Sequence, residues 1–157
     1  MRIAIIMFLL IFLFACNKDD PKIQILTANI NGDSISFVGN AQKYSDLKNG
    51  VLFGYNYHIY NLETPNIYIE AYDSSLQANE FSFQNLSAKY AHFDSDGNSK
   101  SYDAIDGSLN IINENDGVIY GNFYFTFLNV RDKFDTLNVK DGYFEISLEE
   151  YNREWNE

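Results

Sequence analysis

Apolar and polar residues alternate along most of the chain after residue 22. In "VLFGYNYHIY" (51–60), every second residue from Val51 to Ile59 is apolar or aromatic. The same period of two recurs in "IYIEAYD" (67–73), "VIYGNFYFTFLNV" (118–130) and "YFEISL" (143–148). This period is typical of β-strands that bury one face and expose the other. The pattern therefore predicts an all-β, mainly antiparallel domain.

Short turn motifs separate these segments. Glycine next to Asn or Asp tolerates the positive φ that a tight hairpin requires. Four such pairs occur: Asn31-Gly32, Asp106-Gly107, Asp116-Gly117 and Asp141-Gly142. "TPN" (64–66) and "SDGNS" (95–99) add two further breaks. About nine or ten strands are predicted, in an antiparallel β-sandwich or, alternatively, a meander β-barrel.

Two segments also fit a short helix. "NAQKYSDLKNG" offers Asn40 as a helix cap and Gly50 as a stop, which predicts a helix near 41–49. "LEEYNREWNE" (148–157) spaces Leu148, Tyr151 and Trp155 so that they would share one helical face.

The beginning of the chain predicts an export signal. Arg2 precedes a run of apolar residues from 3 to 15, which is shorter than the roughly 20 residues that a membrane-spanning helix needs. Leu13-Phe14-Ala15-Cys16 resembles a bacterial lipobox, although Phe14 is bulky where a small residue is commoner. The alternative is an ordinary signal peptide with a chance cysteine. We expect a cleaved signal peptide over 1–15, a lipidated tether over 16–22 and one domain over 23–157.

The residues behind Cys16 bear on its location. Asn17-Lys18-Asp19-Asp20 resembles the lipoprotein export signal of Bacteroidota, in which a lysine and acidic residues follow the cysteine. That resemblance implies an outer-membrane lipoprotein, held by its acyl chains and facing the exterior. The alternative is a polar tether that only separates the domain from the lipid, which leaves the periplasmic leaflet open.

Three segments carry a wider resemblance. "TANINGDSISF" (27–37), "IYGNFYFTF" (119–127) and "VKDGYFEISL" (139–148) are similar to segments of the small, uncharacterised β-sandwich lipoproteins common in Bacteroidota. Because these motifs are structural, the resemblance implies a fold and a location but no activity.

Composition excludes some classes of function. The formal net charge of −11 repels phosphate backbones, so no nucleic-acid partner is expected. Cys16 is the only cysteine, so no disulfide staples the domain. Its stability must come from packing, for which the chain has 13 phenylalanines and 12 tyrosines.

Candidate catalytic groups are few. The two histidines, His58 and His92, lie in strand patterns and belong to no recognisable triad. Four glutamates could in principle supply a glycosidase pair, but their spacing does not establish it: Glu63, Glu70, Glu80 and Glu145. We therefore expect a protein that is not an enzyme and has no cofactor.

One segment partly matches a calcium loop. Asp94, Asp96 and Asn98 occupy the first, third and fifth positions of that spacing. Glycine falls at the fourth position instead of the sixth, and Ile105 stands at the twelfth in place of glutamate. A polar hairpin turn is the favoured interpretation, and no metal site is predicted.

Tyrosines mark a candidate ligand surface. Tyr68, Tyr72, Tyr120 and Tyr124 alternate with core positions, and their rings would suit stacking on sugars or contact with a protein. Cross-strand packing alone is the alternative. The hypothesis is a non-enzymatic surface lipoprotein that binds a glycan or a protein, or has an accessory role. The alternative is an immunity-type lipoprotein that binds a basic toxin.

Two short segments resemble the Asp-Ser/Thr-apolar pattern used for O-glycosylation in Bacteroidota. They contain Ser34 and Thr136, and chance occurrence in an Asp-rich chain is the favoured interpretation.

Overall fold

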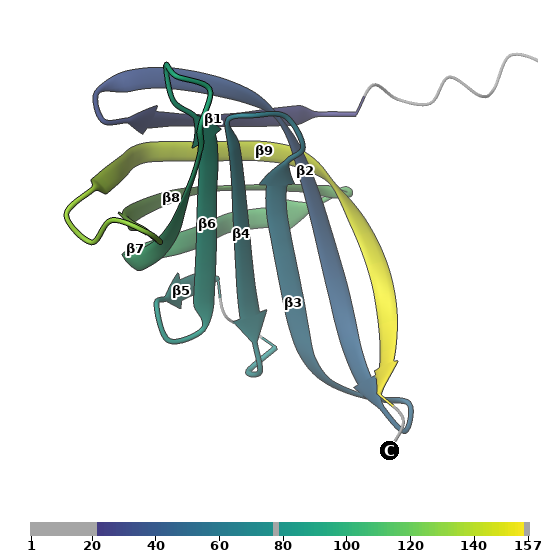
Figure 1. Ribbon diagram of the computed structural model, residues 1–157. Helices are drawn as coiled ribbons and strands as arrows, with labels where there is room; N and C mark the ends of the chain where they lie inside the picture. The colour runs from purple at the N-terminus through teal and green to yellow at the C-terminus, as the bar shows by residue number, and fades with distance from the viewer. Residues whose placement is uncertain (1–21, 77–78, 156–157) are drawn as a thin grey trace, which may run out of the picture.

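The computed structural model describes residues 22–76 and 79–155, which form an all-β domain. Its nine strands follow one another with short connections, and no helix occurs among the described residues (Figure 1). The strands are β1 (Gln24–Ile30), β2 (Asp33–Lys48), β3 (Val51–Asn61), β4 (Asn66–Asp73), β5 (Glu80–Ser82), β6 (Leu86–Phe93), β7 (Ser99–Asn115), β8 (Val118–Asn129) and β9 (Thr136–Trp155).

The strands form one sheet that closes into a ring. The order is β5-β7-β6-β4-β3-β2-β1-β9-β8, and a further pairing of β7 with β8 closes it. All pairings are antiparallel except that the second half of β2 runs parallel to the second half of β9. The prediction of a sandwich-like, mainly antiparallel all-β fold with nine or ten strands is thereby confirmed.

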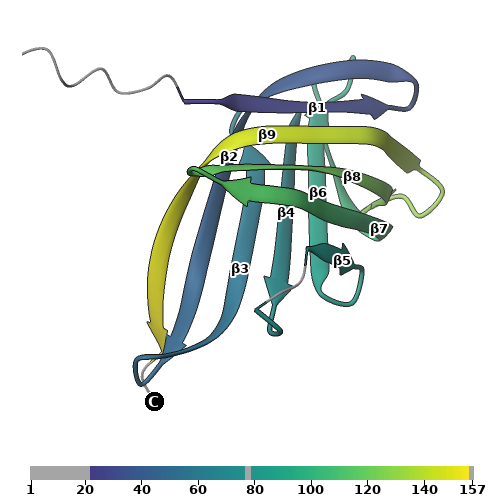
Figure 2. The same ribbon diagram turned by 180° about the vertical axis from the view of Figure 1, so that it is seen from behind.

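The ring is flattened into two layers. The front layer in Figure 1 contains β6, β4, β3 and the second halves of β2 and β9, from about residues 41 and 148 onward. The back layer, which comes forward in Figure 2, contains β1, the first halves of β2 and β9, β8 and most of β7. Because β2 and β9 pass from one layer to the other, each contributes to both, as strands do at the corners of crossed sheets.

The inner faces of the two layers enclose one core. Side chains on alternate positions of each strand meet there, as the period of two requires. The largest fully buried members are Leu26, Ile59, Ile67, Ile69, Phe81, Leu109, Ile119, Phe125, Phe127, Val139, Phe144 and Ile146. The aromatic and aliphatic side chains therefore form one packed core. No disulfide contributes to it among the described residues.

Lys43 is a charged exception on the inner face of β2. Only 12% of its side chain is exposed, and its Nζ donates a hydrogen bond to Glu114 Oε1. The same Nζ lies 4.2 Å from the centre of the Tyr55 ring. Tyr57 donates its hydroxyl proton to Glu114 Oε2 at 3.3 Å, and burial followed by the charge of Glu114 raises the pKa of Tyr57. Lys43 and Glu114 thus form a largely buried, hydrogen-bonded ion pair between β2 and β7.

Two of the four predicted hairpin pairs are turns and two are bulges. Asn31-Gly32 joins β1 to β2, and Asp116-Gly117 joins β7 to β8, so both are confirmed. Asp106-Gly107 lies inside β7, and Asp141-Gly142 lies inside β9, each at a shift in strand register. Positive φ serves a bulge as well as a turn, so the dipeptide alone does not distinguish them. The breaks near 64–66 and 95–99 do separate strands.

Both predicted helices are wrong. Residues 41–48 belong to β2, which gains strand partners on both sides there, β3 on one and β9 on the other. Residues 148–155 continue β9 for the same reason, since they pair with β2. Asn49 and Gly50 both have positive φ and form the β2–β3 hairpin turn, not a helix stop. Strand pairing therefore overrides a weak local helical pattern.

Candidate functional site

The outer side of the front layer carries a second set of side chains. Since Ile59 and Ile69 point into the core, their neighbours in sequence point outward. Most of these neighbours are aromatic. We call the following seven residues the aromatic face: Tyr44 on β2, His58 and Tyr60 on β3, Tyr68 and Tyr72 on β4, and Tyr151 and Trp155 on β9.

Five rings of the aromatic face contact one another across four strands. Tyr60 and Tyr68 have ring centres 6.2 Å apart, and Tyr68 and His58 follow at 5.5 Å. His58 lies 5.0 Å from Tyr44, which stacks on Tyr151 at 5.4 Å with an angle of 22° between the rings. The chain of contacts therefore runs without a break from β4 to β9.

A glycine lets the face extend over β3. Tyr72 lies so close to Gly54 that a Cβ atom there would come within 2.6 Å of the Tyr72 hydroxyl oxygen and 2.8 Å of its ring. The absence of a side chain at residue 54 thus makes room for this ring on the outer side of the sheet.

A buried ion pair lies at the β9 end of the face. Asp46 is 2% exposed and accepts hydrogen bonds from Arg153 Nε at 2.6 Å and Nη2 at 2.9 Å. Trp155 Nε1 also donates to Asp46, at 3.3 Å. The guanidinium lies 4.9 Å from the Trp155 ring and 5.4 Å from the Tyr44 ring. Arg153 is therefore held in place on one side, and Trp155 and Tyr44 flank it.

Polar groups lie among the rings near β4. Glu70 Oε1 accepts a hydrogen bond from Asn56 Nδ2 at 3.1 Å and lies 3.6 Å from His58 Nε2, beyond hydrogen-bond length. Burial lowers the pKa of His58 despite the nearby carboxylate and so favours the neutral imidazole. Within the described part of the chain, Asn56 Oδ1 and His58 Nε2 are buried and have no hydrogen-bond partner.

The structure divides the four tyrosines of the sequence hypothesis. Tyr68 and Tyr72 belong to the aromatic face. Tyr120 and Tyr124 lie on β8, which pairs with β7 and β9, whereas β4 pairs with β3 and β6. The two pairs are therefore on strands that are not neighbours. Tyr124 is 51% exposed on the outer side of the back layer.

Sequence reasoning missed most of the aromatic face. Tyr44, Tyr151 and Trp155 fell in segments interpreted as helices. With a period of two, Tyr44 and Asp46 would lie on the same side of one strand, and Tyr151, Arg153 and Trp155 on the same side of another. The strand signal was thus present, but only the parallel pairing of β2 with β9 brings these residues together.

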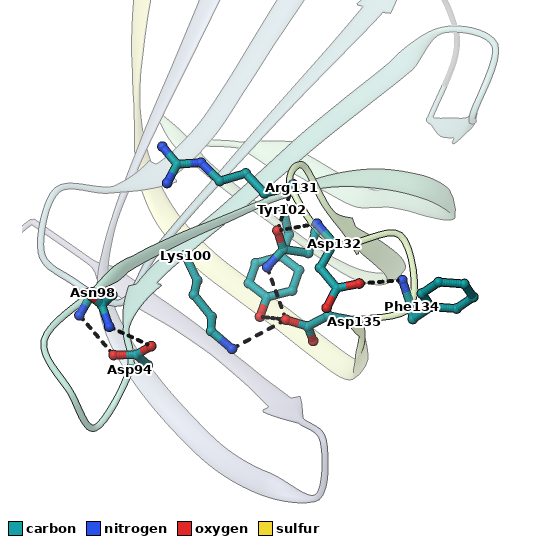
Figure 3. A network of polar contacts seen from close by, with 9 residues as sticks. Asp94, Asn98, Lys100, Tyr102, Arg131, Asp132, Phe134 and Asp135 are labelled. Carbon is teal, nitrogen blue, oxygen red and sulfur yellow. Dashed lines mark hydrogen bonds and ion pairs between the residues drawn. The ribbon is translucent and has the colours of Figure 1, made fainter.

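A second polar region lies where two loops meet at one end of the sheet. A hollow of about 640 Å³ separates the β6–β7 loop from the β8–β9 loop (Figure 3). Asp135 Oδ2 accepts hydrogen bonds from Tyr102 at 2.9 Å, Asn129 at 3.0 Å and Lys100 at 3.4 Å. These contacts, led by that of Tyr102, lower the pKa of Asp135. The network joins the β8–β9 loop to β7. Its charged groups, Asp135 and Lys100, therefore have a structural role in holding the loop.

The calcium-like segment forms the other wall of this hollow. Asp94 Oδ1 accepts the backbone N–H groups of Asp96 at 3.0 Å and Asn98 at 2.8 Å, and the second of these contacts lowers the pKa of Asp94 most. The carboxylate therefore organises its own turn. No cluster of three or more His, Cys, Asp or Glu side chains suited to a metal occurs within residues 22–76 and 79–155.

The remaining sequence predictions fall elsewhere. Cys16, the signal peptide and all but the last residue of the tether lie outside the described residues. Ser34 and Thr136 are both exposed, at the beginnings of β2 and β9. Within the described ranges, no helix is long and apolar enough to cross a membrane.

Comparison of the chain with protein-family models, with curated proteins and with solved structures gives no match.

Proposed function

We propose that this protein is a lipoprotein anchored at Cys16 in the outer membrane, facing the cell exterior, and that it binds a glycan through the aromatic face without catalysing a reaction. The lipobox-like segment and the residues behind it support the location. The observation that carries the binding function is the unbroken contact of aromatic rings from β4 to β9. A contiguous apolar surface that solvent reaches is characteristic of binding sites. In the aromatic face, Tyr151 and Trp155 are exposed and the other five residues are half-buried.

The chemistry of the aromatic face suits a sugar chain. Tyrosine and tryptophan rings provide flat apolar surfaces for the C–H faces of pyranose rings, and their O–H and N–H groups form hydrogen bonds. Glu70 and Arg153 stand among the rings as acceptor and donor for sugar hydroxyls. Four adjacent strands span about 14 Å at a spacing of about 4.8 Å. The surface therefore suits an oligosaccharide lying across the strands better than a single sugar.

Removing two rings tests the proposal. The full-length chain in detergent is applied to a glycan array, beside a variant that combines Tyr44→Ala with Tyr68→Ala. Each stacking ring contributes on the order of 1 kcal/mol, so the double variant should bind about tenfold more weakly or worse. The matched control combines Tyr120→Ala with Tyr124→Ala on β8 and should bind as the wild type does. Circular dichroism verifies that both variants fold.

Other results would reject glycan binding. The proposal fails if the wild type retains no glycan, or if both double variants lose binding equally. Retention of a basic protein instead, with an affinity that falls as salt rises, would favour the immunity-type alternative, because the chain carries a net charge of −11.

The anchor is tested separately. Metabolic labelling with a fatty-acid analogue should mark the wild-type chain and leave Cys16→Ala unmarked. Equal labelling of the two would remove the lipid anchor from the proposal without affecting the glycan test.

A further inference from the structure

The second half of β9 is an open edge of the sheet. Residues 148–155 pair with β2 on one side, while the pairings of β9 with β1 and β8 end by Ser147. The N–H of Leu148 still donates to the carbonyl oxygen of Gly117 at 2.7 Å, so the open edge begins at Glu149. No strand in the described part of the chain occupies the other side. Figures 1 and 2 both show this half of β9 at the margin of the front layer. An exposed edge presents unpaired backbone N–H and C=O groups to any strand that can approach it.

The side chains along this edge are self-complementary. Glu149, Tyr151 and Arg153 follow one another on the outer side of β9. Opposite residues of an antiparallel pair share one side of the sheet. If Tyr151 faces the Tyr151 of a second chain, Glu149 faces Arg153 and Arg153 faces Glu149. The order acid, aromatic, base thus produces two opposite-charge pairs around one aromatic pair.

We propose that two copies of this chain pair antiparallel through their β9 edges, about a two-fold axis at Tyr151. Arg153 binds Asp46 through Nε and Nη2. Guanidinium has five N–H donors, so donors remain for a second carboxylate. Glu149 accepts from Lys22 at 2.8 Å and from Tyr151 at 2.9 Å. A carboxylate has about four acceptor positions, so it can accept a further donor.

The neighbouring registers are unfavourable. A symmetric antiparallel pair can shift only in steps that keep outward residues opposite outward residues. If the two-fold axis moves by one residue to Glu150, Glu150 lies opposite Glu150. If it moves by one residue to Asn152, Glu150 lies opposite Glu154 twice. Like charges directly opposite each other destabilise a sheet. In the proposed register, Glu150 faces Asn152, and Glu154 faces Leu148. Charge therefore selects the register centred on Tyr151.

The pairing would enlarge the aromatic face. Because both copies present the same side of the sheet, the stacked pair of Tyr44 and Tyr151 would continue into the same pair of the second copy. The two aromatic faces would become one surface across a shared sheet. Self-association does not require a glycan, so its test is independent of the proposed function.

Cysteine cross-linking tests the axis. Full-length chains in detergent, carrying Tyr151→Cys or Asn152→Cys, are oxidised with copper phenanthroline and separated on a non-reducing gel. The two thiols at position 151 lie opposite each other and should form a disulfide-linked dimer. Those at position 152 lie two residues out of register, beyond the roughly 7 Å limit for a disulfide. The wild type reports any cross-link through Cys16. Equal cross-linking at 151 and 152, or none at 151, would overturn the proposal.

A charge reversal tests the register. Glu149→Arg places a cation opposite Arg153 and should convert the dimer to monomer in light scattering coupled to size exclusion. Glu149→Gln removes the attraction without adding repulsion and should weaken the dimer less. Arg153 is left unchanged because it neutralises the buried Asp46. A wild type that stays monomeric as its concentration rises, or a dimer that Glu149→Arg leaves intact, would contradict the pairing, provided circular dichroism shows the variants folded.

Discussion

Arg153 on β9 and Asp46 on β2 are joined by two parallel hydrogen bonds across the only parallel strand pairing of the described sheet. Asp46 is 2% exposed, and the guanidinium of Arg153 is the cation that lies against it at 2.6 Å. Removing one partner of a buried ion pair costs far more than the pair itself contributes, because the other charge stays buried. The contact therefore fixes the end of β9 to β2.

Arg153→Ala is expected to destabilise the domain by about 2 kcal/mol, which is below the roughly 3–5 kcal/mol of a fully buried pair because the Arg153 side chain is itself 36% exposed. Urea unfolding measures the change. Arg131→Ala is the matched control, since Arg131 lies in an exposed loop, and it should change stability by less than about 0.5 kcal/mol. Equal effects of the two variants would show that Asp46 does not depend on Arg153.

Lys43 and Glu114 should behave as a coupled pair. Lys43→Met leaves Glu114 beside the core without its cation and is expected to cost about 3 kcal/mol. Adding Glu114→Gln removes the unpaired charge, so the double variant should be more stable than the sum of the two single changes predicts. A double-mutant cycle by urea unfolding measures this coupling. Strictly additive losses would contradict a direct interaction.

Gly107 should tolerate no side chain. Its φ is +155°, and an added Cβ would lie against the Phe125 ring and 2.5 Å from the Tyr124 carbonyl oxygen. Gly107→Ala is therefore expected to destabilise the domain by about 3 kcal/mol. Gly97→Ala is the control, since Gly97 also has positive φ but open space around it, and should cost about 1 kcal/mol. Thermal melts compare the two; similar losses would mean that the bulge can yield.

Stability should fall at high pH through the tyrosines. Burial, followed by the charge of Glu70, raises the pKa of Tyr68 to about 12 from a usual value of 10. A raised pKa means that the unfolded chain loses its proton first. The free energy that the protonated Tyr68 contributes to folding is therefore complete below pH 10 and is lost as pH rises from 10 towards 12. Urea midpoints from pH 8 to pH 11.5 should fall less for Tyr68→Phe than for the wild type. Parallel curves would place the pH dependence elsewhere.

The period of two predicted the strands from Val51 to Asp73 and from Val118 to Leu148 because each buries one face against the core. It failed where both faces of a strand carry polar and aromatic groups, as from Ala41 to Lys48. There, strand pairing on both sides decides the structure, and no local pattern encodes a partner about a hundred residues away. The tyrosine surface shows the same limit. Alternation within one strand correctly groups Tyr68 with Tyr72 on β4 and Tyr120 with Tyr124 on β8, but it cannot tell whether β4 and β8 are neighbours.

The ring depends on a strand that is synthesised after every strand it joins. Leu26 on β1 pairs with Phe144 on β9, and β9 also holds β2 and β8. Until residues 136–155 are available, β1 and β8 each lack a neighbour, and a chain at that stage has long unpaired edges. Contacts so distant in sequence also slow folding. A nascent or truncated chain ending before residue 136 would therefore need protection from aggregation, whereas a chain that includes β9 can cover both of these edges.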